Sequence, residues 1–298
     1  MTYSIAIAGT TDRTKLCAET LLEHPSFEIS FIITPDAKPV GRQQLLTSNP
    51  LKKFADSNQI PTVLIKNKID ESIKNKILAH KKPNFLLVVD FGYLVPEWLL
   101  DLPQIMSLNI HPSALPKWRG SSPGQFVLLS GDTASAVSII QMTTQFDQGP
   151  IVWQEEFEVD QNWTQTEYYK HSFQLATQSL TNVILKLAEK KITPIPQPIT
   201  SPTPVAKKIN KNDAFIEWGE VKAAMTSDKN GALQIERASR AYSPWPLLWT
   251  QIQTSQGQRR MQIISAELNK LGLLNLEKVK IEGMTIKPWQ EVKNVIRD

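Results

Sequence analysis

Short apolar segments alternate with helical segments through the first two thirds of the chain, and this alternation constrains the fold most. The segment Phe85–Val89 (FLLVV) is apolar at every position, and the lysine-rich helical pattern Glu71–Lys82 precedes it. Strands that are apolar on both faces and alternate with helices indicate a parallel sheet covered by helices. The alternation begins with a predicted strand at Tyr3–Ala8 and a helix at Thr14–His24. We therefore predict an α/β fold with a Rossmann-like, mostly parallel sheet.

A proline-rich stretch, Ile192–Val205, separates this alternating region from the rest of the chain. It carries five prolines, and proline fixes φ and removes the backbone donor, so the stretch is expected to be extended and semi-rigid. We predict a catalytic domain over residues 1–191, a linker over 192–205 and a smaller domain over 206–298. The smaller domain is predicted to be β-barrel-like, with one helix through Gln234–Arg240 and strands at Phe215–Trp218, Leu248–Gln253, Arg260–Ala266 and Lys278–Ile286.

Composition excludes several classes of protein. Of the 298 residues, 41% are hydrophobic and 21% are charged, which is ordinary for a globular chain and excludes disordered and fibrous ones. The single cysteine, Cys17, excludes an internal disulfide and a zinc cluster built on cysteine, and fits a reducing compartment. The chain has no run of 18 apolar residues, and no basic stretch precedes its first apolar run. We therefore expect a cytoplasmic protein without a membrane span or a signal peptide.

The positive charge of the chain is concentrated in its last third. The net charge is +4, but residues from Val205 onward carry 15 basic and 10 acidic side chains. This asymmetry suits a module that lies near a polyanion, although such an asymmetry on its own is more often an ordinary solvated surface.

The stretch Ser107–Gly120 (SLNIHPSALPKWRG) holds the residue pair that is most informative about chemistry. Asn109 and His111 lie two positions apart at the carboxyl end of a predicted strand, so both side chains leave the same face. The carboxyl ends of parallel strands form the ligand crevice of an open sheet. An amide beside an imidazole can polarise a carbonyl oxygen and transfer a proton, as acyl transfer requires. A lone histidine could instead cap the strand.

Asp147, in the predicted loop between two strands (QFDQGPIV), is a third candidate. A carboxylate near an imidazole stabilises its protonated form and holds its orientation, but Asp147 could equally form a turn before Gly149. Covalent catalysis is not expected, because Cys17 has no histidine beside it and no GxSxG motif is present. No histidine and glutamate lie at a metal-binding spacing, and the turn Ala8–Asp12 has too few glycines for a dinucleotide site.

Several motifs together resemble the folate-dependent formyltransferase family, and within it the enzymes that act on methionyl-tRNA. NIHPSALPKWRGSSP is similar to the family signature NxHxSLLPxxRGxxP, FDQGPI to its xDxGxI element, and AGTTD to its opening AGTPxF turn. Arg13 stands where that turn usually has an aromatic residue, and Ala114 replaces a leucine. The segments Pro35–Ala55 and Val88–Leu100 resemble the tRNA-facing loop and the pterin segment, and the tail motifs resemble the tRNA-contacting domain.

The resemblance implies a reaction and a set of site residues. It implies that the formyl group of 10-formyltetrahydrofolate passes to the α-amino group of initiator methionyl-tRNA by direct transfer, without a metal, on a monomeric enzyme. The implied catalytic residues are Asn109, His111 and Asp147. The implied folate-binding residues are Phe91, Gly92, Tyr93, Leu94, Val95, Ser113, Ala114, Leu115 and Pro116, and Lys38 and Arg42 are implied to contact the tRNA.

Two alternatives remain open at this point. The motifs NIHPS and DQGPIV also resemble formyltransferases that act on a small amine, either glycinamide ribonucleotide or a nucleotide amino-sugar. The proline-rich linker, the additional domain and the GRQQLL loop favour tRNA over these. A non-catalytic RNA-binding relative is the other alternative, and the intact trio of Asn109, His111 and Asp147 disfavours it. The tail is short compared with the family pattern, and a polar stretch, Thr226–Gly231, precedes its predicted helix.

Overall fold

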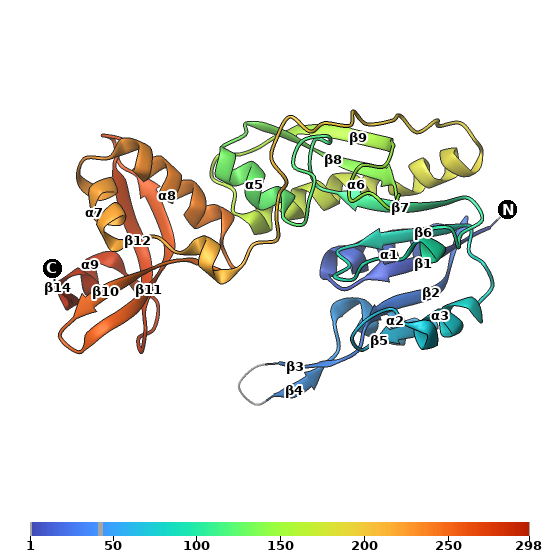
Figure 1. The fold of residues 1–298 in the computed structure, drawn as a ribbon, viewed down its shortest axis with the longest axis horizontal. Coiled ribbons are helices and arrows are strands. Elements are labelled where there is room, and N and C mark those ends of the chain that lie inside the picture. Colours follow the sequence, from blue (N-terminus) through green and yellow to red (C-terminus); the bar gives the residue numbers. More distant parts are fainter. Residues whose placement is uncertain (1, 41–43, 298) are drawn as a thin grey trace. The chain divides into compact units, whose positions relative to one another are not determined.

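The structure is a computed structural model that describes residues 2–40 and 44–297. The chain divides into two compact units, each described here by itself (Figure 1). The first unit comprises Met1–Arg119, Ala136–Glu156 and Lys170–Thr203, and the second comprises Gly120–Ser135, Phe157–Tyr169 and Pro204–Asp298. The division into a catalytic domain, a linker and a tRNA-contacting domain at residues 191 and 205 concerns function and stays a prediction.

The main sheet of the first unit has seven strands in the order β5-β2-β1-β6-β7-β8-β9. The pairs β5–β2, β2–β1, β1–β6 and β6–β7 are parallel, whereas β7 and β8 are antiparallel. The predicted Rossmann-like, mostly parallel sheet is therefore confirmed. The strands are β1 (Tyr3–Gly9), β2 (Phe27–Pro35), β5 (Thr62–Ile65), β6 (Phe85–Val89), β7 (Met106–His111), β8 (Ala134–Gln141) and β9 (Ile151–Glu158).

Burial of the central strands explains why their sequences are apolar at successive positions. All five residues of β6 are buried, as are the last five residues of both β1 and β2. Burying a large aliphatic or aromatic side chain contributes about 1.5–3 kcal/mol, which favours apolar residues at these positions. Among apolar residues, β-branched and aromatic ones are the most common in strands. The helices of this region are α1 (Asp12–Leu22), α2 (Pro50–Ser57), α3 (Glu71–Leu78), α4 (Glu97–Leu100) and α6 (Gln165–Ala188), whose first residues belong to the second unit.

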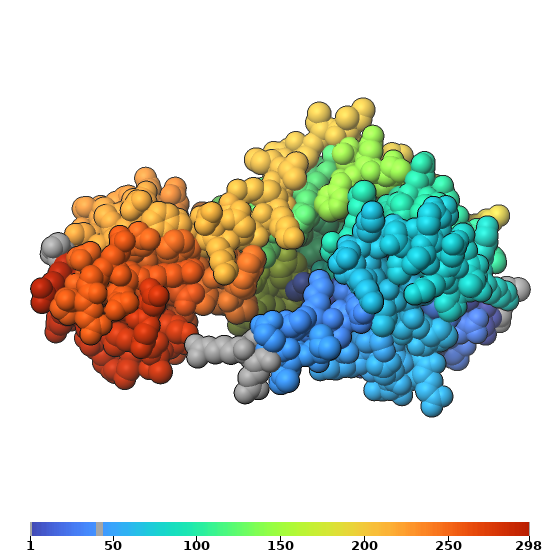
Figure 2. Space-filling view, turned by 60° about the horizontal axis from the view of Figure 1, so that its bottom comes forward, coloured from blue at the N-terminus to red at the C-terminus, as the bar shows by residue number. Residues whose placement is uncertain are grey.

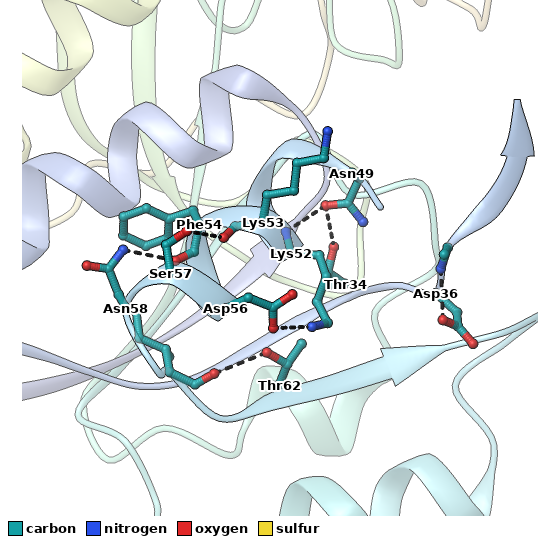
Figure 3. A network of polar contacts seen from close by, with 12 residues as sticks. Thr34, Asp36, Asn49, Lys52, Lys53, Phe54, Asp56, Ser57, Asn58 and Thr62 are labelled. Atoms are coloured by element: carbon teal, nitrogen blue, oxygen red, sulfur yellow. Dashed lines mark hydrogen bonds and ion pairs between the residues drawn. The ribbon is translucent and has the colours of Figure 1, made fainter. Parts of the chain in front are cut away.

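Asn49 fixes the start of α2 and ties it to the end of β2. Its Oδ1 accepts hydrogen bonds from the Lys52 amide at 3.0 Å and from the Thr34 hydroxyl at 3.2 Å (Figure 3). Its Nδ2 donates to the Pro35 carbonyl at 3.0 Å. An asparagine N-cap of this kind satisfies a backbone donor that the helix itself cannot satisfy.

A two-stranded hairpin, β3 (Lys38–Val40) with β4 (Leu45–Thr47), projects from the segment between β2 and α2 (Figure 1). Lys38 is exposed on β3, and Leu45 and Leu46 are exposed on β4. The predicted tRNA contact Arg42 lies outside the described residues.

The second unit contains an open antiparallel sheet in the order β13-β12-β11-β10-β14, which confirms the barrel-like fold predicted for the tail. Figure 2 shows this C-terminal segment in space-filling form, in orange to red. Its strands are β10 (Leu248–Thr254), β11 (Gly257–Leu268), β12 (Leu274–Ile281), β13 (Lys287–Pro288) and β14 (Ile296–Arg297). Its helices are α5 (Pro123–Ser130), α7 (Trp218–Thr226), α8 (Lys229–Ala241) and α9 (Trp289–Val292), with 3₁₀ turns at Lys211–Ala214 and Lys293–Val295.

The prediction of one helix and of a strand at Phe215–Trp218 is wrong. Residues 218–226 form a second helix, α7, and only Phe215 makes an isolated bridge, to Trp249. The physical reason is a capping box at the start of α7, in which the side chain of Glu217 accepts a hydrogen bond from the backbone N–H of Glu220, and the side chain of Glu220 accepts one from the backbone N–H of Glu217. The aromatic residues favoured a strand, but the local capping interaction and the burial of Val221 favour the helix.

Candidate active site

Strand β7 places Asn109 and His111 at the edge where the parallel strands of the first unit end. Asn109 pairs with Val88 of β6 and Ile140 of β8, and His111 pairs with Ser138. Since side chains alternate along a strand, Asn109 and His111 lie on the same face. His111 is buried and Asn109 is half-buried, so this face is partly shielded from water at the position where ligands bind in open α/β sheets.

The contacts of His111 determine which of its ring nitrogens faces Asp147. Its Nε2 lies 3.0 Å from the carbonyl oxygen of Trp118. A carbonyl only accepts, so we assign the hydrogen to Nε2, which leaves Nδ1 with the lone pair in the neutral ring. Nδ1 lies 3.7 Å from Oδ2 of Asp147, which is beyond a direct hydrogen bond, so the carboxylate faces this edge of the ring without bonding to it.

Asp147 reaches His111 from the loop between β8 and β9. Its backbone is in the left-handed region, with φ of 53°, which is uncommon for residues other than glycine but accessible to aspartate. Its side chain is only 9% exposed. The structure thus brings together the imidazole of His111 and the carboxylate of Asp147, which are 36 residues apart in the sequence.

Asn109 retains the capacity to bind a ligand. Within residues 2–40 and 44–297, the structure shows no hydrogen bond from its side-chain amide to another protein group. A half-buried amide without a protein partner is uncommon, because desolvation of such a group is costly. Its donors and its acceptor are therefore available to a polar ligand at this edge.

The predicted pterin segment, Phe91–Val95, follows β6 directly and has no regular secondary structure. Because β6 pairs with β7 in parallel and Val88 pairs with Asn109, this segment starts three residues beyond the partner of Asn109. The rings of Phe91 and Tyr93 are half-buried and 5.4 Å apart. Gly92 and Leu94 are exposed. No backbone hydrogen bond of these five residues is seen in the described part of the chain, so their N–H and C=O groups can pair with a polar heterocycle.

In the predicted folate-binding segment Ser113–Pro116, two of the four residues are buried and their polar groups bond to other parts of the protein. Ser113 is fully buried, its hydroxyl donates to the Lys117 carbonyl at 2.7 Å, and its carbonyl accepts from the Ser138 hydroxyl at 2.7 Å. Leu115 is buried as well, and its carbonyl accepts from Gln154 at 3.1 Å. Ala114 and Pro116 are half-buried and are the members of this segment that retain exposed surface.

Two polar networks beside these residues were missed by the sequence predictions. Asp90, which directly follows β6, accepts hydrogen bonds on Oδ2 from the Thr11 hydroxyl and from Arg13 Nε, each at 2.6 Å. The Asp147 loop is held by Gln197, which in turn contacts Arg119. Arg119 belongs to the RG pair of the signature motif, which was a usable signal, but nothing in the sequence near Gln197 indicates its partner.

The thiol of Cys17, the metal-ligating side chains and a surface pocket lie apart from this cluster or lack the properties of a second site in the described residues. Cys17 is fully buried, and burial raises the pKa of its thiol far above neutrality, so a reactive thiolate is not available there. In the described residues, no group of three or more His, Cys, Asp or Glu side chains is arranged to hold a metal ion. A pocket of about 430 Å³ is lined by α1 and α2 residues, none of them a predicted site residue. No helix in the described ranges is long and apolar enough to span a membrane.

The polar side chains of this open α/β sheet gather where its parallel strands end, which is the position at which such sheets bind ligands. The chain belongs to the formyl transferase family, whose model matches residues 3–184. It is 32% identical over 269 residues to a methionyl-tRNA formyltransferase of Idiomarina loihiensis, covering 89% of this chain and 80% of the relative. It is therefore an enzyme of formyl transfer.

Solved structures agree on the fold. A methionyl-tRNA formyltransferase from Clostridium thermocellum aligns with a TM-score of 0.58 at 17% identity, covering 94% of this chain and 98% of that one. An N-formyltransferase from Helicobacter canadensis, solved with folinic acid and dTDP-3-aminofucose, aligns with a TM-score of 0.62 at 19% identity, covering 90% and 88%. At such identities the likeness establishes the fold alone.

Proposed function

We propose that this enzyme transfers the formyl group of 10-formyltetrahydrofolate to the α-amino group of initiator methionyl-tRNA. The observation that carries the proposal is the approach of Asp147 to His111 beside the available amide of Asn109. The curated relative that is 32% identical carries the name of this activity. We propose further that the enzyme acts as a monomer in the cytoplasm.

In the proposed mechanism, the neutral α-amino group attacks the formyl carbon, and the carbonyl π electrons move to the oxygen. The Asn109 amide and a proton on His111 Nδ1 hydrogen-bond the resulting oxyanion. Asp147 holds the charged imidazole and accepts the proton that the amine loses, directly or through water. The carbon–N10 bond then breaks, and a proton returns to N10 as tetrahydrofolate leaves. Each donor to such an oxyanion contributes roughly 3 kcal/mol.

The residues around the site fit a folate as the formyl donor. A pterin ring presents alternating donors and acceptors at its edge, and the backbone groups of residues 91–95 are available to pair with them. The half-buried rings of Phe91 and Tyr93 give the same segment an apolar surface. In this proposal Phe91–Val95 binds the pterin, and the half-buried Ala114 and Pro116 line the remainder of the site with Ser113 and Leu115.

The tRNA is proposed to contact basic and aromatic groups outside the catalytic cluster. The residues from Val205 onward carry the excess positive charge of the chain, and the Arg260 guanidinium lies 4.2 Å from the centre of the Trp249 ring. Such groups bind phosphates and stack on bases without reading sequence. Lys38 is exposed on β3 and is proposed to contact the acceptor end together with Arg42.

The experiment that tests the proposal compares three acceptors with 10-formyltetrahydrofolate as the donor. They are initiator methionyl-tRNA, glycinamide ribonucleotide and a nucleotide amino-sugar. The proposal predicts that methionyl-tRNA is formylated with much the highest kcat/KM. Formylation of only a small amine would contradict the tRNA acceptor, and this outcome has some structural basis, because the Helicobacter canadensis N-formyltransferase has the same fold. Absence of transfer to all three would favour a non-catalytic RNA-binding protein.

A further inference from the structure

The proline-rich segment that follows α6 packs along the candidate site. We call residues 192–203 the strap. Ile195 of the strap pairs with Ile151 at the start of β9, and Figure 1 shows this segment running beside β9. Further along, the Ser201 hydroxyl donates to the Pro116 carbonyl at 2.7 Å, and the Thr203 hydroxyl accepts from the Trp118 amide at 2.7 Å. The strap is therefore bonded to the segment whose Trp118 carbonyl orients His111.

At the centre of the strap, Gln197 bonds to the loop that carries Asp147. Its Nε2 donates to the Asp147 carbonyl at 3.0 Å and to the Gly149 carbonyl at 2.7 Å. Both amide hydrogens are thereby directed at the backbone on either side of Gln148. The loop has little room to shift, since a Cβ at Gly149 would collide with the Gln141 carbonyl oxygen. Asp147 has a positive φ, a backbone conformation that is unfavourable for residues other than glycine, and the two hydrogen bonds from Gln197 hold the backbone of the loop in it.

Arg119 fixes Gln197 in turn. The Arg119 side chain is buried, and its Nε and Nη2 donate to Gln197 Oε1 at 3.1 and 2.9 Å. Its remaining contacts are with strap carbonyls, Nη1 to Ile199 at 3.0 Å and Nη2 to Pro198 at 2.7 Å. Burial lowers the pKa of Arg119, while the negative charge of Asp147 opposes that shift. The arginine, the glutamine and the loop form one connected chain of hydrogen bonds.

We propose that Gln197 is a positioning residue for the formyl-transfer reaction, and that Arg119 holds it in place. The inference rests on the proposed function, because it assigns Gln197 an effect only through Asp147. Gln197 bonds to the backbone carbonyls of residues 147 and 149 and not to the Asp147 carboxylate. It therefore sets the direction of that carboxylate toward His111 and leaves the carboxylate oxygens without a bond to Gln197. A semi-rigid strap suits this role, since prolines flank Gln197 on both sides and restrict its backbone.

Three variants of the full chain separate positioning from stability. Gln197→Ala removes both donors and the acceptor for Arg119. Gln197→Glu keeps an acceptor for Arg119 but cannot donate to the two carbonyls. Thr200→Ala is the matched control, because Thr200 is an exposed residue of the same strap. For each variant, kcat and both KM values are measured, together with the melting temperature and amide hydrogen exchange of the 143–150 segment without ligands.

We expect both Gln197 variants to lose about tenfold to a hundredfold in kcat, with each KM within about twofold of wild type, because the reacting groups are misplaced. We also expect faster hydrogen exchange in the 143–150 segment of both variants, and no change in Thr200→Ala. Wild-type kcat and exchange in Gln197→Ala or Gln197→Glu would overturn the inference. So would a loss of activity that only follows a lower melting temperature. A wild-type enzyme that transfers no formyl group would instead refute the proposed function, while the exchange data would still test the bond to the loop.

Discussion

Two aspartates of the first unit adopt the same uncommon backbone conformation and are held in it differently. Asp90 has φ of 49° and Asp147 has φ of 53°. Asp90 follows β6 and directly precedes the predicted pterin segment, and Asp147 lies in the loop after β8. Each therefore turns the chain at a position that shapes the candidate site. Left-handed conformations of residues other than glycine cost on the order of 1–3 kcal/mol and need support from the surrounding structure.

The support reaches Asp90 through its side chain and Asp147 through its backbone. One carboxylate oxygen of Asp90 accepts hydrogen bonds from both Thr11 and Arg13. Asp147 instead receives Gln197 at its carbonyl, and its carboxylate faces His111. The comparison teaches that the same backbone turn can be stabilised through the carboxylate, as at Asp90, or through the backbone, as at Asp147, where the carboxylate remains able to act in a reaction. We accordingly expect Asp90 to matter for stability and Asp147 for turnover.

The largest expected effect is that of Asp147→Asn on turnover. Asparagine tolerates the left-handed conformation and keeps the backbone bonds from Gln197, so the substitution removes only the charge. We expect kcat for formyl transfer to fall by about a hundredfold or more, the range of general acid–base contributions. The melting temperature should match that of the wild type. Wild-type turnover in this variant would remove the difference between the two aspartates.

Asp90→Asn is expected to act mainly on stability. It removes the ion pair with Arg13 and weakens two hydrogen bonds to a charged acceptor, so unfolding should require about 1.5–3 kcal/mol less free energy. The matched control is Asp56→Asn, which removes the exposed ion pair with Lys52 in α2 and should cost about 0.5 kcal/mol or less. Urea denaturation of the three proteins measures this. Equal stability of Asp90→Asn and Asp56→Asn would contradict the structural role.

A smaller effect is expected for Thr11→Val, which keeps the size of the side chain and the Arg13–Asp90 ion pair. It removes one hydrogen bond to the Asp90 carboxylate, so we expect a loss of about 1 kcal/mol in urea denaturation. Combined with Asp90→Asn, the two losses should not add fully, because both substitutions act on the same hydrogen bond between Thr11 and Asp90. Full additivity in this double-mutant cycle would show that the two residues act independently.

The smallest effect is expected for a third aspartate, Asp213 of the second unit, which serves as a purely structural reference. Lys207 and the Asn210 amide bond to its carboxylate and hold its pKa below the ordinary value. A lowered pKa stabilises the fold above the ordinary aspartate pKa of about 4, and this contribution disappears as the pH falls through the folded value. Asp213→Asn should therefore lose at most about 1 kcal/mol at pH 7.

The pH dependence of this difference provides the check. The gap in stability between wild type and Asp213→Asn should shrink as the pH falls below the ordinary aspartate pKa of about 4 and through the lower pKa of the folded state, because the wild-type carboxyl then becomes protonated as well. Thermal unfolding across this range measures it. A difference in stability that is constant with pH would show that the charge of the Asp213 carboxylate adds nothing to its bonds with Lys207 and the Asn210 amide.

The sequence predicted those parts of the fold that depend on local pattern and burial. The all-apolar segment Phe85–Val89 identified a buried parallel strand because both of its faces are covered by other elements. The spacing of Asn109 and His111 placed both on one face of β7, since alternation along a strand is a local property. The helix at residues 218–226 was missed because Trp218 and Phe215 favour a strand, although the Glu217 and Glu220 capping signal was present.

The remaining features depend on contacts between distant segments. The approach of Asp147 to His111 requires the β8–β9 loop to fold over the end of β7, and the motif resemblance, rather than any local pattern, suggested it. Gln197 lies 50 residues from Asp147 in a stretch whose composition indicates only an extended linker. The ion pair between Arg13 and Asp90 joins the first turn of α1 to the residue after β6, which are 77 positions apart in the sequence. No propensity or periodicity encodes such pairs.

The most direct measurement is the turnover of Asn109→Ala and His111→Ala in a formyl-transfer assay with 10-formyltetrahydrofolate and initiator methionyl-tRNA. Each variant should lose at least about a hundredfold in kcat, because each lacks one donor to the oxyanion, and each should keep the wild-type circular dichroism spectrum. Near-normal turnover in either folded variant would contradict the assignment of this cluster as the catalytic centre.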